Sequence, residues 1–215
     1  MGSKARIAGE RYMVRRATRL VLDVFRWCRS DCLVAHELTV GKSIADLVIL
    51  RPPSACRWPQ APLSIAESAI LSSLRRLGEA RVDTIADDVY MRADHVRRIL
   101  LGRLSTWLLV QGVDEGPFRS VTTWVARSEV IAVEAKLLRW RDALLQAAVY
   151  RRYADRAFVL LPQARAEIAR RHKDDFLDRG VGLLSYHAQG VYQMISSPRV
   201  AEYTWHREFA ISRMR

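Results

Sequence analysis

The spacing of apolar residues changes several times along the chain. Between residues 10 and 28 they recur every three or four positions, which predicts an amphipathic helix with one face on a core. Two strand-like apolar runs follow at 32–40 and 42–50, and Gly41 between them favours a hairpin. The segment 51–62 contains four prolines. Since proline cannot donate to a strand ladder, this segment is predicted to be a linker.

A different pattern begins at residue 62. Ser64 and Glu67 have the spacing of a capping box, and Gly78 stands where the helical pattern stops. Two more helical patterns follow, and then two short strand patterns around a Gly-Pro turn. Three helices closed by a hairpin is the order of a winged helix-turn-helix, which we predict over 62–123.

Strand and helix patterns alternate after residue 124, which predicts an α/β fold with a mixed sheet flanked by helices. The winged-helix module interrupts this sheet in sequence, so the expected domains are 1–61 and 124–215 for the larger domain and 62–123 for the inserted one. The final stretch, 187–215, carries only weak strand signals. The predicted elements after the insertion are a strand over 129–138, a helix over 139–155, a strand over 157–162, a helix over 163–178 and a strand over 180–186.

Charge and composition indicate which class of binding partner the protein has. The chain has 215 residues, half of them hydrophobic, and its 35 Lys and Arg against 23 Asp and Glu give a net charge of +12. A basic protein attracts acidic polymers, so nucleic acid, and DNA in particular, is the leading partner. Most of the basic residues are arginines, whose planar fork suits phosphate, although an arginine-biased codon composition would produce the same excess.

Nothing in the chain predicts a membrane or secretory protein. No apolar stretch approaches the length of a membrane span, and the basic N-terminus lacks a signal-peptide core. The three cysteines show no zinc-like spacing, which fits a reducing compartment. We therefore expect a cytoplasmic protein with no membrane partner.

Charged residues interrupt two of the predicted apolar strands. Asp46 is a lone acid within 42–50, and Glu134 and Lys136 alternate onto one face of the strand over 129–138. A buried carboxylate is unfavourable unless it is paired or binds a cation. Carboxylates of Asp46 and Glu134 that converge from neighbouring strands, with the carbonyl of Ala135, would suit Mg²⁺ or Mn²⁺ and leave room for substrate phosphate.

A lysine beside such a site would orient or deprotonate the attacking water and offset charge on the phosphate. The residues therefore favour phosphodiester hydrolysis. The simpler interpretation is that Glu134 and Lys136 form an exposed pair and that Asp46 marks a strand end.

The ordered set of Asp46, "EAK" at 134–136 and "QAAVY" at 146–150 resembles the PD-(D/E)XK nuclease superfamily, which has the restriction-endonuclease-like fold. The resemblance implies that Asp46 and Glu134 bind metal and that Lys136 assists the attacking water. The chain departs from the usual pattern in two ways. Asp46 precedes Glu134 by 88 residues (134 minus 46), which the inserted module would account for, and Ala45 stands where a proline is usual.

The resemblance extends to four further residues. Gln146 and Tyr150 share a helix face at i, i+4 spacing and look like the Gln-xxx-Tyr motif, which implies that they position the site or contact the DNA backbone. Glu10 on the first helix and Glu37 in the first strand would serve as additional acids.

The third helix of the predicted winged helix carries basic residues on its outer side. These would contact a duplex, although exposed arginines are often only a solvated face, and the acidic hairpin tip at 113–117 argues against a strongly basic wing. The candidate DNA-binding residues are Arg92, His95, Arg97, Arg98 and Arg103.

The leading hypothesis is a metal-dependent DNA nuclease whose winged helix helps to bind DNA. A non-catalytic DNA-binding regulator on a nuclease-like scaffold is the main alternative. A third possibility is that the inserted module serves oligomerisation. A homodimer would provide the two sites that cutting both strands needs.

Overall fold

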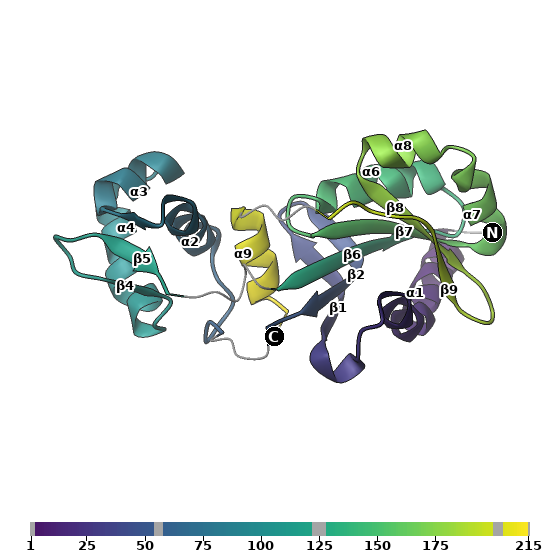
Figure 1. Cartoon of the computed structure of the whole chain (residues 1–215), viewed down its shortest axis with the longest axis horizontal. Helices are drawn as coiled ribbons and strands as arrows, with labels where there is room; N and C mark the ends of the chain where they lie inside the picture. The colour runs from purple at the N-terminus through teal and green to yellow at the C-terminus, as the bar shows by residue number, and fades with distance from the viewer. Residues whose placement is uncertain (1–2, 54–57, 122–127, 200–203, 215) are drawn as a thin grey trace. The chain divides into compact units, whose positions relative to one another are not determined.

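The structure is a computed structural model that describes residues 3–53, 58–121, 128–199 and 204–214 (Figure 1). The chain divides into two compact units. Unit 1 contains Met1–Arg51 and Glu129–Ala201, and unit 2 contains Pro52–Ser128 and Glu202–Arg215. The segment between the two halves of unit 1 thus forms a unit of its own. The C-terminal end differs from the expected division, because 202–215 belongs with unit 2.

Unit 1 is built on a six-stranded mixed sheet with the order β1-β2-β6-β7-β8-β9. The pairs β1–β2, β2–β6 and β8–β9 are antiparallel, whereas β6, β7 and β8 run parallel to one another. The predicted α/β class with a mixed sheet is therefore confirmed. The strands are β1 (Leu33–Val40), β2 (Ser43–Arg51), β6 (Glu129–Ala135), β7 (Arg156–Pro162), β8 (Val181–Tyr186) and β9 (Val191–Ile195).

Helices cover both faces of this sheet (Figure 1). The long helix α1 packs on one face, where Val21 lies in a core with alternate strand residues such as Leu47, Val133 and Phe158. The opposite face is covered by the helices that follow β6 and β7. The helices of unit 1 are α1 (Ser3–Phe25), the short η1 (Arg29–Asp31), α6 (Trp140–Tyr150), α7 (Gln163–Arg170) and α8 (Lys173–Asp178).

Most elements of unit 1 match the prediction, including the hairpin at Gly41, which has a positive φ of 63°. Three boundaries do not. Helix α1 ends at Phe25 rather than near residue 28, since Arg26 takes a positive φ of 55°. The single helix expected over 163–178 is two helices. Strand β6 ends at Ala135, so Lys136 follows the strand instead of lying within it.

Unit 2 contains three helices followed by a hairpin, in the predicted order. The capping box is confirmed: the Ser64 hydroxyl accepts from the Glu67 N–H at 3.2 Å, and the Glu67 carboxylate accepts from the Ser64 N–H at 2.7 Å. The elements are α2 (Ile65–Leu77), β3 (Glu79–Ala80), α3 (Val82–Val89), α4 (Ala93–Ile99) continuing as a π-helix η2 (Leu100–Leu104), β4 (Val110–Gly112) and β5 (Phe118–Ser120), with sheet order β3-β5-β4.

A C-terminal helix that the sequence pattern did not predict completes unit 2. This helix, α9 (Trp205–Ser212), packs on α2. Glu208 is buried in it and forms an ion pair with the nearly buried Arg75 of α2. The Ser212 hydroxyl accepts from the Leu63 N–H at 3.1 Å. Among the described residues, no helix is both long and apolar enough to cross a membrane.

Candidate active site

Strands β2 and β6 separate at one end of their pairing. The antiparallel ladder runs from Arg51 and Glu129 to Leu47 and Val133, whereas β2 stays paired with β1 beyond that point. The next residue of β2, Asp46, replaces the missing ladder bond with its side chain: its Oδ2 accepts from the Ala135 N–H at 2.8 Å. The separation leaves room for side chains between the two strand ends.

Lys136 lies among three carboxylates at this separation. Its Nζ is 2.5 Å from Glu134 Oε1 and 3.9 Å from both Asp46 Oδ2 and Glu10 Oε2. The Ala135 carbonyl also accepts from Nζ, at 3.3 Å. We call Glu10, Asp46, Glu134 and Lys136 the carboxylate–lysine cluster. The structure thus brings together an acid from α1, an acid from β2 and the Glu-x-Lys pair from β6.

Helices fix the cluster from both faces of the sheet. Glu10 of α1 accepts from the Leu137 N–H at 3.3 Å. The buried Tyr150 of α6 places its hydroxyl within hydrogen-bonding distance of Glu134 Oε2 and of the Ile44 carbonyl, the latter at 2.7 Å. Tyr150 therefore holds the Glu134 carboxylate against the end of β2. Gln146, one turn earlier on α6, is exposed.

Burial and crowding of like charges shift the pKa values of the cluster. Burial, followed by repulsion from Asp46, raises the pKa of Glu134 to about 7, although Lys136 and Tyr150 act in the opposite direction. Burial also raises the pKa of Asp46. Burial alone would lower the pKa of Lys136, but the surrounding carboxylates outweigh it and raise the value. The carboxylates consequently favour a nearby cation.

The donor chemistry of the cluster fits a hard divalent cation. The oxygens of Asp46, Glu134 and the Ala135 carbonyl are the ligand type that Mg²⁺ and Mn²⁺ prefer, and Mg²⁺ commonly takes only one or two carboxylates together with water. Within the residues described, no three His, Cys, Asp or Glu side chains form a ready-made metal site. A metal here would be held by these few oxygens, with Glu10 beside Lys136.

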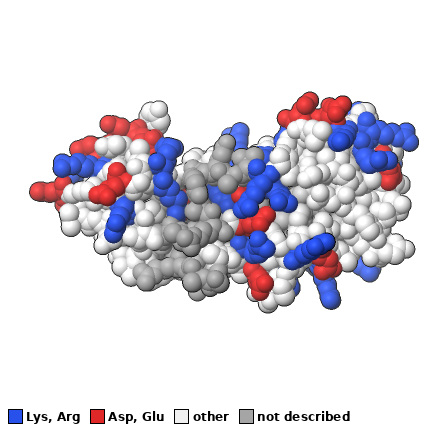
Figure 2. Space-filling model, in the orientation of Figure 1, with Lys and Arg blue, Asp and Glu red and all other residues white. Residues whose placement is uncertain are grey.

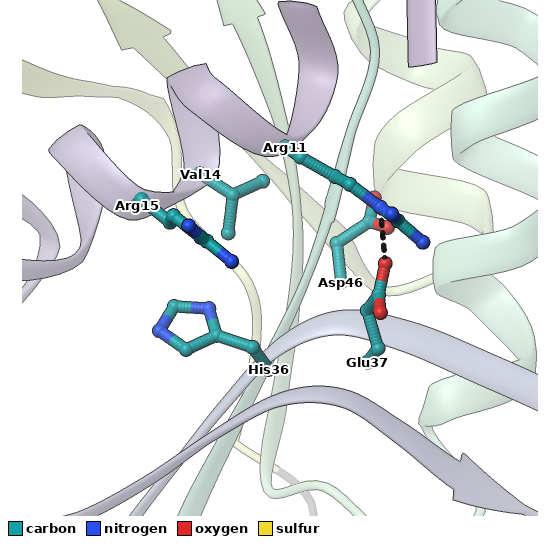
Figure 3. A pocket seen from close by; sticks show the side chains of 6 residues that line it. All are labelled: Arg11, Val14, Arg15, His36, Glu37 and Asp46. Carbon is teal, nitrogen blue, oxygen red and sulfur yellow. Dashed lines mark ion pairs between the residues drawn. The ribbon is translucent and has the colours of Figure 1, made fainter. Parts of the chain in front are cut away.

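Glu37 lies near the cluster but is paired elsewhere. It has a positive φ of 55°, is exposed, and forms an ion pair with Arg11 of α1 at 2.7 Å. Figure 3 shows Arg11 directed toward Glu37 and Asp46 in a small hollow, which Val14, Arg15 and His36 also line. Positive φ at a non-glycine residue stores strain that is most common at functional sites.

The sequence pattern did not identify Arg11, Arg15 and His36 as neighbours of Asp46. The spacing of Arg11 and Arg15 places them on the same side of a helix, but the pattern does not show that this side faces Asp46. His36 carried no such signal, since its place depends on how α1 crosses β1.

The structure separates the five candidate DNA-binding residues of unit 2 into two groups. Arg97 forms ion pairs with Asp94 at 3.6 Å and with Asp114 of the hairpin tip at 2.9 Å. Arg103 forms an ion pair with Glu67 at 3.1 Å and lies over the Trp107 ring. The remaining three, Arg92, His95 and Arg98, are exposed. His95 and Arg98 share a side of α4 at three-residue spacing, and Arg92 is the extended residue just before the helix.

Comparison with protein-family models found no match, and the same is true of the comparisons with curated proteins and with solved structures.

Proposed function

We propose that this protein is a metal-dependent nuclease of the PD-(D/E)XK type, with a restriction-endonuclease-like unit 1 and a winged-helix unit 2 that binds DNA. The observation that carries the proposal is the convergence of Glu10, Asp46 and Glu134 on Lys136 where β2 and β6 separate. Three acids and one lysine meet there at a strand end, although Asp46 precedes Glu134 by 88 residues (134 minus 46).

The residues have distinct roles in this proposal. Asp46, Glu134 and the Ala135 carbonyl would hold Mg²⁺ or Mn²⁺, which when bound supplies charge stabilisation at the phosphate and acidifies the attacking water. Lys136 Nζ would donate to the attacking water or to a phosphate oxygen. Tyr150 orients Glu134 through its hydroxyl, and Glu10 keeps Lys136 within reach of the reacting atoms.

Unit 2 supports the DNA-binding half of the proposal. Its order of three helices and a hairpin is that of a winged helix, and Arg92, His95 and Arg98 are exposed basic residues at the start of α4 and along it. The acidic tip of the hairpin is tied to Arg97 at 2.9 Å, which leaves the helix rather than the hairpin as the surface for phosphate.

A cleavage assay on supercoiled, linear, single-stranded and branched DNA tests the nuclease proposal. We expect cleavage with Mg²⁺ or Mn²⁺, none with EDTA, and loss of at least about a hundredfold in rate for Glu134→Gln and Lys136→Ala, on the scale of general acid–base contributions.

Glu129→Gln is the matched control, because Glu129 is also a buried acid of β6 but pairs with Arg51 at the other end of the strand. Cleavage should survive in this variant. Full activity in Glu134→Gln, with folding intact in both variants, would contradict the assignment.

A DNA-binding regulator without catalysis is the second candidate. The exposed basic side of α4 favours it, since that surface needs no metal chemistry. It predicts DNA binding by the wild-type protein with no cleavage on any of the four substrates. If instead unit 2 serves oligomerisation, charge reversal at Arg92 and Arg98 will leave the affinity for DNA unchanged.

A further inference from the structure

A cleft runs along α1 beside the first strand of the sheet. The small hollow at Asp46 adjoins a larger cavity of about 660 Å³, and both are lined by Arg15 and His36. We call the two together the α1–β1 cleft. It begins at Asp46 of the carboxylate–lysine cluster and continues along the helix to Trp27. The larger cavity is lined by, among others, Arg15, Arg19, Leu22, Trp27, Arg29 and His36.

Arginines form a row along this cleft. Arg11, Arg15 and Arg19 follow at four-residue spacing, so a rise of about 1.5 Å per residue separates neighbours by about 6 Å along the helix. Arg11 is paired with Glu37. In the described part of the chain, no acidic side chain forms an ion pair with Arg15, Arg19 or Arg29.

The cleft is electropositive at its centre. Three guanidinium groups, those of Arg15, Arg19 and Arg29, line the larger cavity against the single carboxylate of Asp23. This excess of positive charge attracts an anion. Asp23 lines the far end and offsets part of this charge. On the face shown in Figure 2, basic side chains stand in separate groups with acidic ones among them.

The size and lining of the cleft suit a strand rather than a duplex. A cavity of about 660 Å³ is in the range of pockets for small molecules and nucleotides and is too small for a double helix. Regularly spaced guanidinium groups match a chain of phosphates, and the apolar walls at Leu22 and Trp27 offer contact for sugar or base. Binding to a lipid surface would instead use a convex basic face of the protein.

We propose that the α1–β1 cleft binds the sugar–phosphate backbone of a single nucleic-acid strand and leads it to the carboxylate–lysine cluster. The part of this inference that directs the strand to the cluster rests on the proposed nuclease function. It gives the enzyme a strand-binding surface within unit 1, independent of α4. It also implies that a duplex end or a displaced strand reaches the cluster as a single strand.

Binding of a labelled single-stranded oligothymidylate to the full chain in EDTA tests the cleft without catalysis. Arg15→Ala and Arg19→Ala should each weaken binding several-fold and lower the slope of log affinity against log salt by about 0.7, the value for one lost phosphate contact on a single strand. Both side chains are exposed, so the substitutions should leave the fold intact. The unfolding midpoint checks this.

Arg16→Ala is the matched control, because Arg16 lies next to Arg15 on α1 but outside the cleft and bonds the Tyr12 hydroxyl at 2.9 Å. It removes the same charge and should leave affinity and salt slope nearly unchanged. Equal effects in Arg15→Ala and Arg16→Ala would overturn the inference, since net charge alone would then explain the binding. The inference would also be overturned if binding of the oligothymidylate required a 5′-phosphate. The same holds if the cleft substitutions weakened binding only to phosphatidylserine vesicles and not to the oligothymidylate.

The cleft and the nuclease proposal fail in different ways. If the wild-type protein never cleaves but Arg15→Ala loses strand binding, the cleft is supported and the nuclease proposal is not. If cleavage requires Glu134 while Arg15→Ala and Arg19→Ala bind the strand as the wild type does, the nuclease proposal stands and the cleft is overturned.

Discussion

At the scale of single residues, the site depends on charges that a sheet interior disfavours. Glu134 is nearly fully buried, and the free energy that its ionised form costs is offset only in part by Lys136 and the Tyr150 hydroxyl. Sites that bind cations commonly hold carboxylates in this way, because the bound ion removes the repulsion. Without the ion, the same arrangement should make folding depend on pH.

That dependence can be given a direction. The pKa of Glu134 is about 7 when folded and near its ordinary value of about 4.3 when unfolded. The folded state therefore retains a proton that the unfolded state has lost. The stability that this proton contributes is fully present below the unfolded pKa and is lost as pH rises through about 7.

Glu134→Gln cannot ionise, so in EDTA its stability relative to the wild type should rise between acidic and alkaline pH. The upper bound on this change is about 4 kcal/mol, from a difference of about 2.7 between the folded and unfolded pKa at about 1.4 kcal/mol per pKa unit. Urea unfolding, monitored by hydrogen exchange of the β6 amides, measures this stability difference at each pH. A difference between variant and wild type that stays constant with pH would show that Glu134 titrates normally.

At the scale of elements, the local sequence pattern was enough to predict the hairpin β1–β2, the apolar strands β6 to β8 and the capped helix α2. Each of these has its own hydrophobic period or its own cap. The end of β6 was not predictable, since β6 ends where its pairing with β7 stops, at Ala135 and Leu160, and not where the run "VIAVEAKLL" ends. The break between α7 and α8 and the existence of α9 likewise depend on packing against other elements.

The same distinction applies to the candidate site. Asp46, Glu134 and Lys136 were detectable because charges stand out in apolar strands. Glu10 was detectable only as an additional acid that the resemblance implies, and the structure places it 3.9 Å from Lys136. The arginines of the α1–β1 cleft were missed because many arginines in this chain look alike in sequence, and only the position of α1 shows which of them line a hollow.

The basic residues at α4 lead to a testable prediction about binding to duplex DNA. Arg92→Ala and Arg98→Ala should each weaken duplex binding and lower its salt slope by about 0.9 per lost contact. Arg97→Ala is the control, because Arg97 is already paired with Asp114 and should change the slope little. Electrophoretic mobility shifts over a range of salt concentrations measure all three. Equal slopes in Arg97→Ala and Arg98→Ala would mean that the ion pair opens on binding.

At the scale of the whole molecule, the proposed chemistry and the proposed duplex binding belong to different units. Every member of the carboxylate–lysine cluster belongs to unit 1, and the basic side of α4 belongs to unit 2. Unit 2 is closed by α9, whose buried Glu208 pairs with Arg75 of α2. Burial raises the pKa of Glu208, and Arg75 and, to a lesser extent, Arg207 act in the opposite direction, so its charge relies chiefly on Arg75. Loosening unit 2 should therefore separate the two functions.

Arg75→Ala leaves the Glu208 carboxyl buried without its partner, which costs about 3–5 kcal/mol. We expect faster hydrogen exchange in α2 and α9, weaker duplex binding, and unchanged exchange in the strands of unit 1. Cleavage of a short single-stranded substrate, which needs only the cluster and the α1–β1 cleft, should continue at nearly the wild-type rate. Arg81→Ala, an exposed substitution in the same unit, should change none of these. If Arg75→Ala abolishes single-strand cleavage while the unit 1 amides stay protected, then unit 2 contributes directly to the chemistry and the division of labour is wrong.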